Sequence, residues 1–119
     1  MKAFRPFLAE YRALVLRLRQ EGFRVRWTSI MAPVQLEGHL PSGEAFYFRC
    51  RWDTCRLDVA PARQDPVRHP TWTQSISRWG QYEASGLDAA EAETALRELL
   101  SAYTDYRRVD RPEHGGEQP

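Results

Sequence analysis

The chain of 119 residues has no long hydrophobic run. No stretch approaches the roughly 18 consecutive apolar residues that indicate a membrane-spanning helix. The N-terminus also lacks the apolar segment of a secretory signal peptide. Hydrophobic residues still make up 42% of the chain, and four of them are tryptophan, which excludes disorder for most of its length. The sequence therefore predicts a folded, soluble and cytoplasmic protein with no membrane contact.

Catalytic motifs are missing as well. The sequence has no glycine-rich phosphate loop, no G-x-S-x-G elbow and no H-E-x-x-H pair. Its three histidines, His39, His69 and His114, have no readable partners. His69, beside Arg68 and near Asp65, resembles acid–base machinery, but such chemistry also needs a second positioned group. We therefore expect no enzymatic activity, no cofactor and no metal site.

Cysteine is scarce, with only Cys50 and Cys55. A zinc site with a histidine would need a tighter ligand pattern than C-x4-C. In the strand register derived below, the two cysteines are diagonal neighbours at roughly 7–8 Å between Cα atoms, which exceeds the usual span of a disulfide. Because thiols stay reduced in the cytosol, we predict two reduced, buried cysteines that pack as small hydrophobic side chains.

The strongest signal that is present is an alternation of apolar and polar residues from Val34 onward. A period of two is typical of strands with one face in a core and the other in water. Pro41-Ser42-Gly43 interrupts the alternation and fits a three-residue hairpin loop, because glycine reaches positive φ without strain. The resulting register places Leu36 opposite Phe48. The predicted core face holds Val34, Leu36, Gly38, Leu40, Phe46, Phe48, Cys50 and Trp52.

A second turn and a further strand complete the predicted sheet. Apolar residues switch to odd positions after Trp52, so we expect a two-residue turn at Asp53-Thr54 that sets Cys50 opposite Leu57. Val25 and Trp27 indicate a strand before the first hairpin. The prediction is a four-stranded antiparallel meander over Arg24–Ile30, Val34–Leu40, Ala45–Trp52 and Cys55–Ala60.

Both ends of the chain show helical patterns that would cover the apolar face of this sheet. Apolar residues recur at helical spacing from Pro6 to Gln20, and Gly22 followed by an apolar residue resembles a Schellman stop. Asp88, with an acidic residue three positions later, indicates the cap of a helix that runs to about Arg107. The predicted fold class is α+β, with the N-terminal and C-terminal helices packed on one face of the sheet.

The segment over residues 61–86 is harder to interpret. Its prolines indicate a loop in the first half. Trp72, Ile76 and Trp79 have the spacing of a short helix, while nearby threonine and serine leave a strand open. We expect residues 1–108 to form one domain and the polar residues 109–119 to form a flexible tail.

Charge is uneven along the chain. Residues 1–63 carry 11 basic and 6 acidic side chains, whereas residues 64–119 carry 6 and 10, and only Lys2 among the basic residues is lysine. The solvent side of the predicted sheet gathers arginines with one tyrosine, a combination that can bind single-stranded nucleic acid. This alternative nucleic-acid site comprises Arg24, Arg26, Tyr47, Arg49, Arg51 and Arg56. Three acidic residues on or near that face and a formal net charge of +1 argue against it.

Aromatic residues are frequent in the part of the sequence between the predicted sheet and the predicted C-terminal helix. Trp72, Trp79 and Tyr82 are of the kind that anchors protein interfaces, although in a small domain they also complete cores. The sequence therefore favours a non-enzymatic interaction module, such as an adaptor, inhibitor or immunity-type protein, that binds a protein partner. Self-association into a homodimer is a further option, with the basic sheet face of one copy against the acidic helix of another.

Overall fold

The computed structural model describes residues 4–28, 34–81 and 83–116, with side chains described for residues 8–28, 34–81 and 83–109. Its elements are α1 (Phe4–Gln20), β1 (Arg24–Trp27), β2 (Val34–His39), β3 (Ala45–Arg51), β4 (Thr54–Ala60), β5 (Trp72–Ile76), the short 3-10 helix η1 (Ala84–Gly86) and α2 (Ala89–Gly116).

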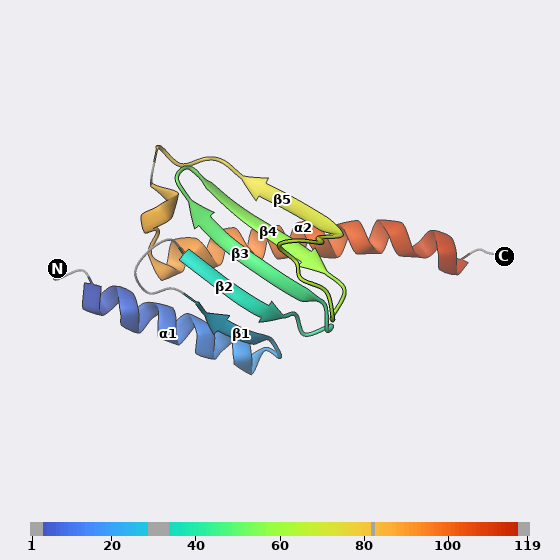
Figure 1. Ribbon diagram of the computed structural model, residues 1–119, viewed down its shortest axis with the longest axis horizontal. Coiled ribbons are helices and arrows are strands. Elements are labelled where there is room, and N and C mark those ends of the chain that lie inside the picture. The colour runs from blue at the N-terminus through green and yellow to red at the C-terminus, as the bar shows by residue number, and fades with distance from the viewer. Residues whose placement is uncertain (1–3, 29–33, 82, 117–119) are drawn as a thin grey trace.

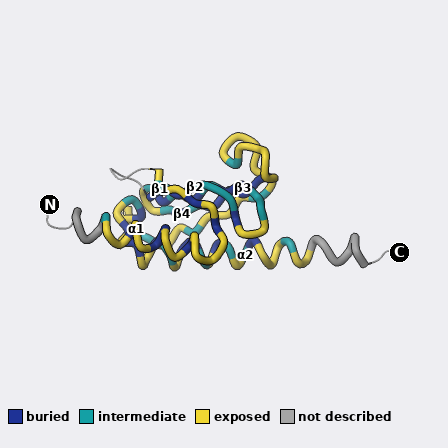
Figure 2. The backbone as a smooth tube through the Cα atoms, turned by 90° about the horizontal axis from the view of Figure 1, so that it is seen from below, coloured by how far each residue is buried: buried dark blue, intermediate teal, exposed yellow. Residues whose placement is uncertain are grey.

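The strands form one antiparallel sheet in the order β1-β2-β3-β4-β5, so each strand pairs with the next one along the chain (Figure 1). Both helices lie on the same side of the sheet, which leaves the opposite side without a helical cover (Figure 2). We call that uncovered side the outer face. The chain therefore forms two layers, as the sequence predicts for an α+β fold.

Local signals in the sequence set the ends of several elements correctly. The amide of Phe23 donates to the carbonyl of Leu18 at 3.1 Å and Gly22 has a φ of 102°, which is the expected Schellman end of α1. The side chain of Asp88 accepts from the amide of Glu91 at 2.8 Å and caps α2.

The first hairpin also has the predicted register. Gly43 takes a φ of 109°, and Leu36 pairs with Phe48. Phe46 and Phe48 are fully buried between the sheet and the helices, whereas Tyr47 on the other face is only half-buried. The inner face of the sheet meets the helices through a buried set that includes Tyr11, Leu14, Leu18, Leu36, Phe46, Phe48, Leu57, Val59, Leu96 and Leu99.

The predicted sheet was one strand short. Residues Trp72–Ile76 form β5 and pair with β4, with Trp72 opposite Val59, instead of forming the short helix that their spacing favoured. Trp72 and Ile76 share the inner side of the sheet at alternate positions and are half-buried, while the threonine and serine between them are exposed. Positions 72 and 76 lie on one face in a strand as well as in a helix, so their spacing alone could not separate the two.

The second hairpin was predicted with the wrong turn. The two turn residues are Trp52 and Asp53, not Asp53 and Thr54, so Cys50 lies opposite Cys55 and Arg49 lies opposite Arg56. Trp52 leaves the core face that we predicted for it and is 56% exposed.

The corrected register changes the state of the cysteines. Cys50 and Cys55 are direct cross-strand neighbours with 3.9 Å between their Cα atoms, and they form a disulfide. The prediction of reduced thiols is therefore wrong, although their expected burial is confirmed because neither residue is exposed. The prediction failed because it set the pair two residues out of register.

The C-terminal helix is longer than predicted, since α2 continues past Arg107 to Gly116. Its second half extends beyond the edge of the sheet (Figure 1). The division into a domain over residues 1–108 and a flexible tail over residues 109–119 stays a prediction. Within the described ranges, neither helix is long and apolar enough to cross a membrane.

Candidate functional site

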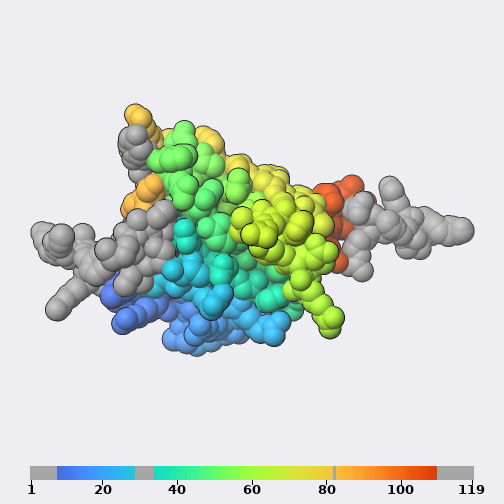
Figure 3. Space-filling view, in the orientation of Figure 1, coloured from blue at the N-terminus to red at the C-terminus, as the bar shows by residue number. Residues whose placement is uncertain are grey.

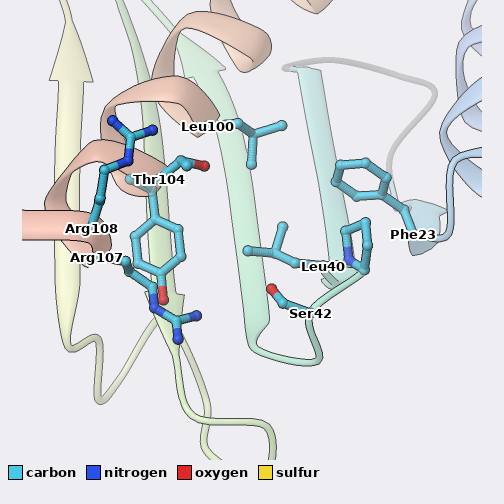
Figure 4. Close-up of a pocket in the computed structure, with 9 residues that line it drawn as sticks. Phe23, Leu40, Ser42, Leu100, Thr104, Arg107 and Arg108 are labelled. Atoms are coloured by element: carbon cyan, nitrogen blue, oxygen red, sulfur yellow. The ribbon is translucent and has the colours of Figure 1, made fainter. Parts of the chain in front are cut away.

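An apolar groove opens where α2 passes the loop between β2 and β3 (Figure 4). Its volume is about 740 Å³, which lies within the range of ligand-binding pockets in proteins. Leu40 and Leu100 point toward each other across it, with Phe23 to one side. We call it the α2 groove, and it is lined by Phe23, Leu40, Pro41, Ser42, Leu100, Tyr103, Thr104, Arg107 and Arg108.

The floor of the α2 groove is built by three separate parts of the chain. Phe23 follows the end of α1, Leu40 follows the end of β2, and Tyr103 comes from the middle of α2. All three are less than 9% exposed, so their positions are fixed by the core. The upper wall is accessible, because Thr104 and Arg108 are exposed. The groove thus combines a rigid apolar floor with an open polar wall.

Polar groups converge on one side of the α2 groove around the carboxylate of Glu44. The Tyr103 hydroxyl donates to this carboxylate at 2.7 Å, and Arg107 and Ser42 also contact it. Burial alone would raise the pKa of Glu44, but the hydrogen bonds from Ser42 and Tyr103 and the charge of Arg107 hold it below its usual value. Burial raises the pKa of Tyr103 to about 12, and its bond to Glu44 adds to that shift.

This cluster keeps Glu44 ionised and Tyr103 protonated at neutral pH. Perturbed groups beside an apolar pocket mark a candidate binding site. The arrangement can hold an apolar group on its floor and offer hydrogen bonds at its rim. Across the described residues, no three His, Cys, Asp or Glu side chains come together in a way that could hold a metal ion.

Sequence reasoning missed the α2 groove because it depends on tertiary contacts. Glu44 and Tyr103 are 59 residues apart, and no local pattern announces that they meet.

The aromatic residues predicted as a binding surface are separated in the structure. Trp72 begins β5 and contacts the rings of Tyr103 and Tyr106, whereas Trp79 lies beyond the other end of the strand beneath the Arg78 guanidinium. Both tryptophans are half-buried and pack against the core. Tyr82 lies outside the described residues. Trp72 and Trp79 therefore add to the core, and the role of the three aromatic residues in binding a partner stays a prediction.

The strand register places the predicted arginine surface on the outer face, opposite the side of the sheet that holds Phe46 and Phe48. Figure 3 views this outer face. Two of its charges are paired there: Arg26 pairs with Glu37, and the Arg56 Nε lies 3.4 Å from the buried carboxylate of Asp58. Arg24, Arg49 and Arg51 make no ion pair within the part of the chain that the structure describes, and Tyr47 is half-buried between strands. The loop that follows β4 stands out over this face (yellow-green in Figure 3), and its Ala62 carbonyl contacts the His39 ring at 3.0 Å.

Comparison with protein-family models, with curated proteins and with solved structures found no match.

Proposed function

We propose that this protein is a non-enzymatic interaction module that receives an apolar side chain of a protein partner in the α2 groove. The observation that carries the proposal is an open groove with an apolar floor, set beside the hydrogen-bonding cluster of Glu44, Tyr103 and Arg107. Protein interfaces commonly combine an apolar centre with a polar rim of this kind. An adaptor, an inhibitor and an immunity-type protein would each use such a surface.

The α2 groove is better suited to a protein segment than to a small molecule, because small-molecule sites usually enclose most of their ligand. The groove is open to solvent along Pro41, Ser42 and Thr104, which are all exposed, so a ligand would stay partly accessible. Beyond the groove, the backbone of α2 extends past the edge of the sheet (Figure 1). Helix faces next to apolar grooves are a recurrent way to bind protein segments.

Filling the groove tests this function. Thr104→Trp adds bulk to the open wall without changing the buried floor, whereas Ser101→Trp adds the same side chain to an exposed position of α2 that does not line the groove. Each purified variant is used as bait in the native extract beside the unchanged protein. The affinity of a stoichiometric protein partner is then measured after its purification.

We expect Thr104→Trp to weaken the complex roughly tenfold or more, as interface hot spots do, and Ser101→Trp to leave it unchanged. Equal affinity of both variants would contradict binding in the groove. Circular dichroism of both variants shows that the fold is kept.

Nucleic-acid binding is the second candidate function, and the charges of Arg24, Arg49 and Arg51, with which no described acidic residue forms an ion pair, favour it. An oligonucleotide shift assay at two salt concentrations tests it, because contacts to phosphates release counterions and make affinity fall steeply with salt. Neutralising the five arginines of the outer face would abolish such binding. Binding that is tight, sensitive to salt and lost in that variant would replace our proposal.

The cytoplasmic location expected from the sequence stays a proposal. The Cys50–Cys55 disulfide removes one argument for it, since disulfides persist mainly in oxidising compartments. The mass of the protein isolated under native conditions with free thiols alkylated decides whether the bond exists in the cell.

A further inference from the structure

The turn between β3 and β4 presents an exposed tryptophan in an unusual backbone conformation. Trp52 has a φ of 57° and is, among the described residues, the sole non-glycine with a positive φ. Its side chain is 56% exposed although tryptophan is the largest hydrophobic side chain. Bulky residues rarely adopt positive φ, and such outliers persist where the surrounding structure enforces them.

Several restraints enforce this conformation. The Cys50–Cys55 disulfide closes the base of the turn. The amide of Trp52 donates to the Ser85 hydroxyl at 2.7 Å, and the carbonyl of Trp52 accepts from the amide of Ala84 at 2.6 Å. The disulfide therefore links the two strands that flank the turn, and two hydrogen bonds with η1 hold the backbone of Trp52. We call the segment Cys50–Cys55 the Trp52 turn.

A fixed, exposed aromatic side chain is well suited to binding. Its backbone is already ordered, so association costs less conformational entropy than it would for a mobile loop. Tryptophan is also strongly enriched among the residues that dominate interface energies. The fold itself needs no tryptophan here, because the ring lies outside the buried core.

The charges beside the Trp52 turn indicate what kind of surface would meet it. The Arg51 guanidinium lies 5.4 Å from the centre of the Trp52 ring. Arg49, two positions earlier in the same strand, faces Arg56 directly across the sheet. Asp58 already lies 3.4 Å from Arg56, whereas no described acidic residue pairs with Arg49 or Arg51, so these two charges favour a partner that brings carboxylates.

We propose that the Trp52 turn docks into an apolar pocket rimmed by carboxylates on a protein partner. A nucleic acid fits less well, because the Arg51 guanidinium already lies over the Trp52 ring and occupies a face on which a base would stack.

This surface is distinct from the α2 groove. The groove includes the loop between β2 and β3, whereas the Trp52 turn joins β3 to β4, so the two sites lie at opposite ends of β3 (Figure 1). The inference extends the proposed interaction function with a second contact and gives the chemistry of its partner. One molecule could therefore bind two partners at once.

The test compares Trp52→Gly with a matched control. Glycine removes the ring but accepts the positive φ, so the turn keeps its shape. Leu16→Ala removes another hydrophobic side chain with the same 56% exposure, from α1. The full-length proteins are used as bait in native extract with and without nuclease treatment, the bound partner is purified, and its dissociation constant is measured for each variant at two salt concentrations.

We expect Leu16→Ala to bind like the unchanged protein and Trp52→Gly to bind roughly tenfold or more weakly. Arg51→Gln should weaken binding and reduce its dependence on salt, because it removes a charge that faces the partner. Unchanged affinity of Trp52→Gly, a Trp52-dependent species that is captured only from extract without nuclease, or the lack of any partner that depends on Trp52 would each overturn the proposal. Thr104→Trp separates the two sites, since blocking the groove leaves binding through Trp52 intact.

Discussion

Position 52 requires a backbone conformation that favours glycine, yet tryptophan occupies it. In a two-residue hairpin turn with positive φ at the first position, glycine is the usual choice. The disulfide and two hydrogen bonds hold Trp52 there, one donated by the Trp52 amide to Ser85 and one accepted by the Trp52 carbonyl from Ala84. Tryptophan is less stable than glycine in this backbone conformation. A role of the exposed ring in binding explains why tryptophan occupies the position.

Two substitutions of Trp52 measure this cost. Trp52→Gly and Trp52→Ala both remove the ring and differ only by one Cβ atom. We expect the glycine variant to have the higher free energy of unfolding, by roughly 1 kcal/mol, because Cβ is unfavourable at positive φ. Chemical denaturation of both proteins measures the difference. Equal stabilities, or a more stable alanine variant, would show that the conformation at position 52 is not strained.

At the scale of elements, one carboxylate joins the β2–β3 hairpin to α2. Glu44 follows the hairpin loop, and its contacts with Tyr103 and Arg107 fix the helix over one end of the sheet. The pKa of Glu44 is lower in the folded protein than its usual value of 4.5. Its contribution to stability is therefore present above the unfolded pKa and is lost as the pH falls through the folded pKa.

Glu44→Gln tests this link between hairpin and helix. At neutral pH we expect the variant to lose about 1–2 kcal/mol of unfolding free energy, since hydrogen bonds to a charged group are replaced by weaker ones. The difference should shrink at a pH below the usual glutamate range, where the carboxylate of the unchanged protein also becomes protonated. Glu10→Gln, at an exposed position of α1, controls for the loss of one charge. A difference that does not vary with pH would contradict the role of Glu44.

The elements that sequence analysis predicted well carry their own local signals. The Schellman end at Gly22, the cap at Asp88 and the loop ending in Gly43 depend on residues next to one another. The register between β3 and β4 has no such signal. A shift by two residues keeps every side chain on the same face, so the apolar alternation is satisfied equally well by the wrong turn.

At the scale of the whole molecule, the disulfide adds to the free energy of unfolding that the small hydrophobic core provides. Cys50 and Cys55 lie on central strands and are fully buried. Closing even this short ring restricts the unfolded chain and contributes roughly 2 kcal/mol in the chain-entropy model. The bond also links the stability of the protein to the redox state of its surroundings.

Chemical denaturation with and without a reductant that acts on the unfolded chain measures this contribution. We expect the reductant to lower the free energy of unfolding by roughly 2 kcal/mol, because the same protein then lacks only the crosslink. The double variant Cys50→Ala/Cys55→Ala should be insensitive to the reductant. An unchanged protein that is equally insensitive would show that the two cysteines are reduced in solution.

The order of the strands has a consequence for synthesis on the ribosome. Because every strand pairs with the one made just before it, the sheet can assemble from the N-terminus while the chain is still growing. The apolar face of the sheet, however, cannot be fully covered while the strands are being made. The helix α1 is made first and contacts β1, but β4 and β5 pack against α2, which is the last element to emerge. In the nascent sheet, the apolar side chains of Leu57 and Val59 therefore stay accessible to other chains until α2 has been synthesised.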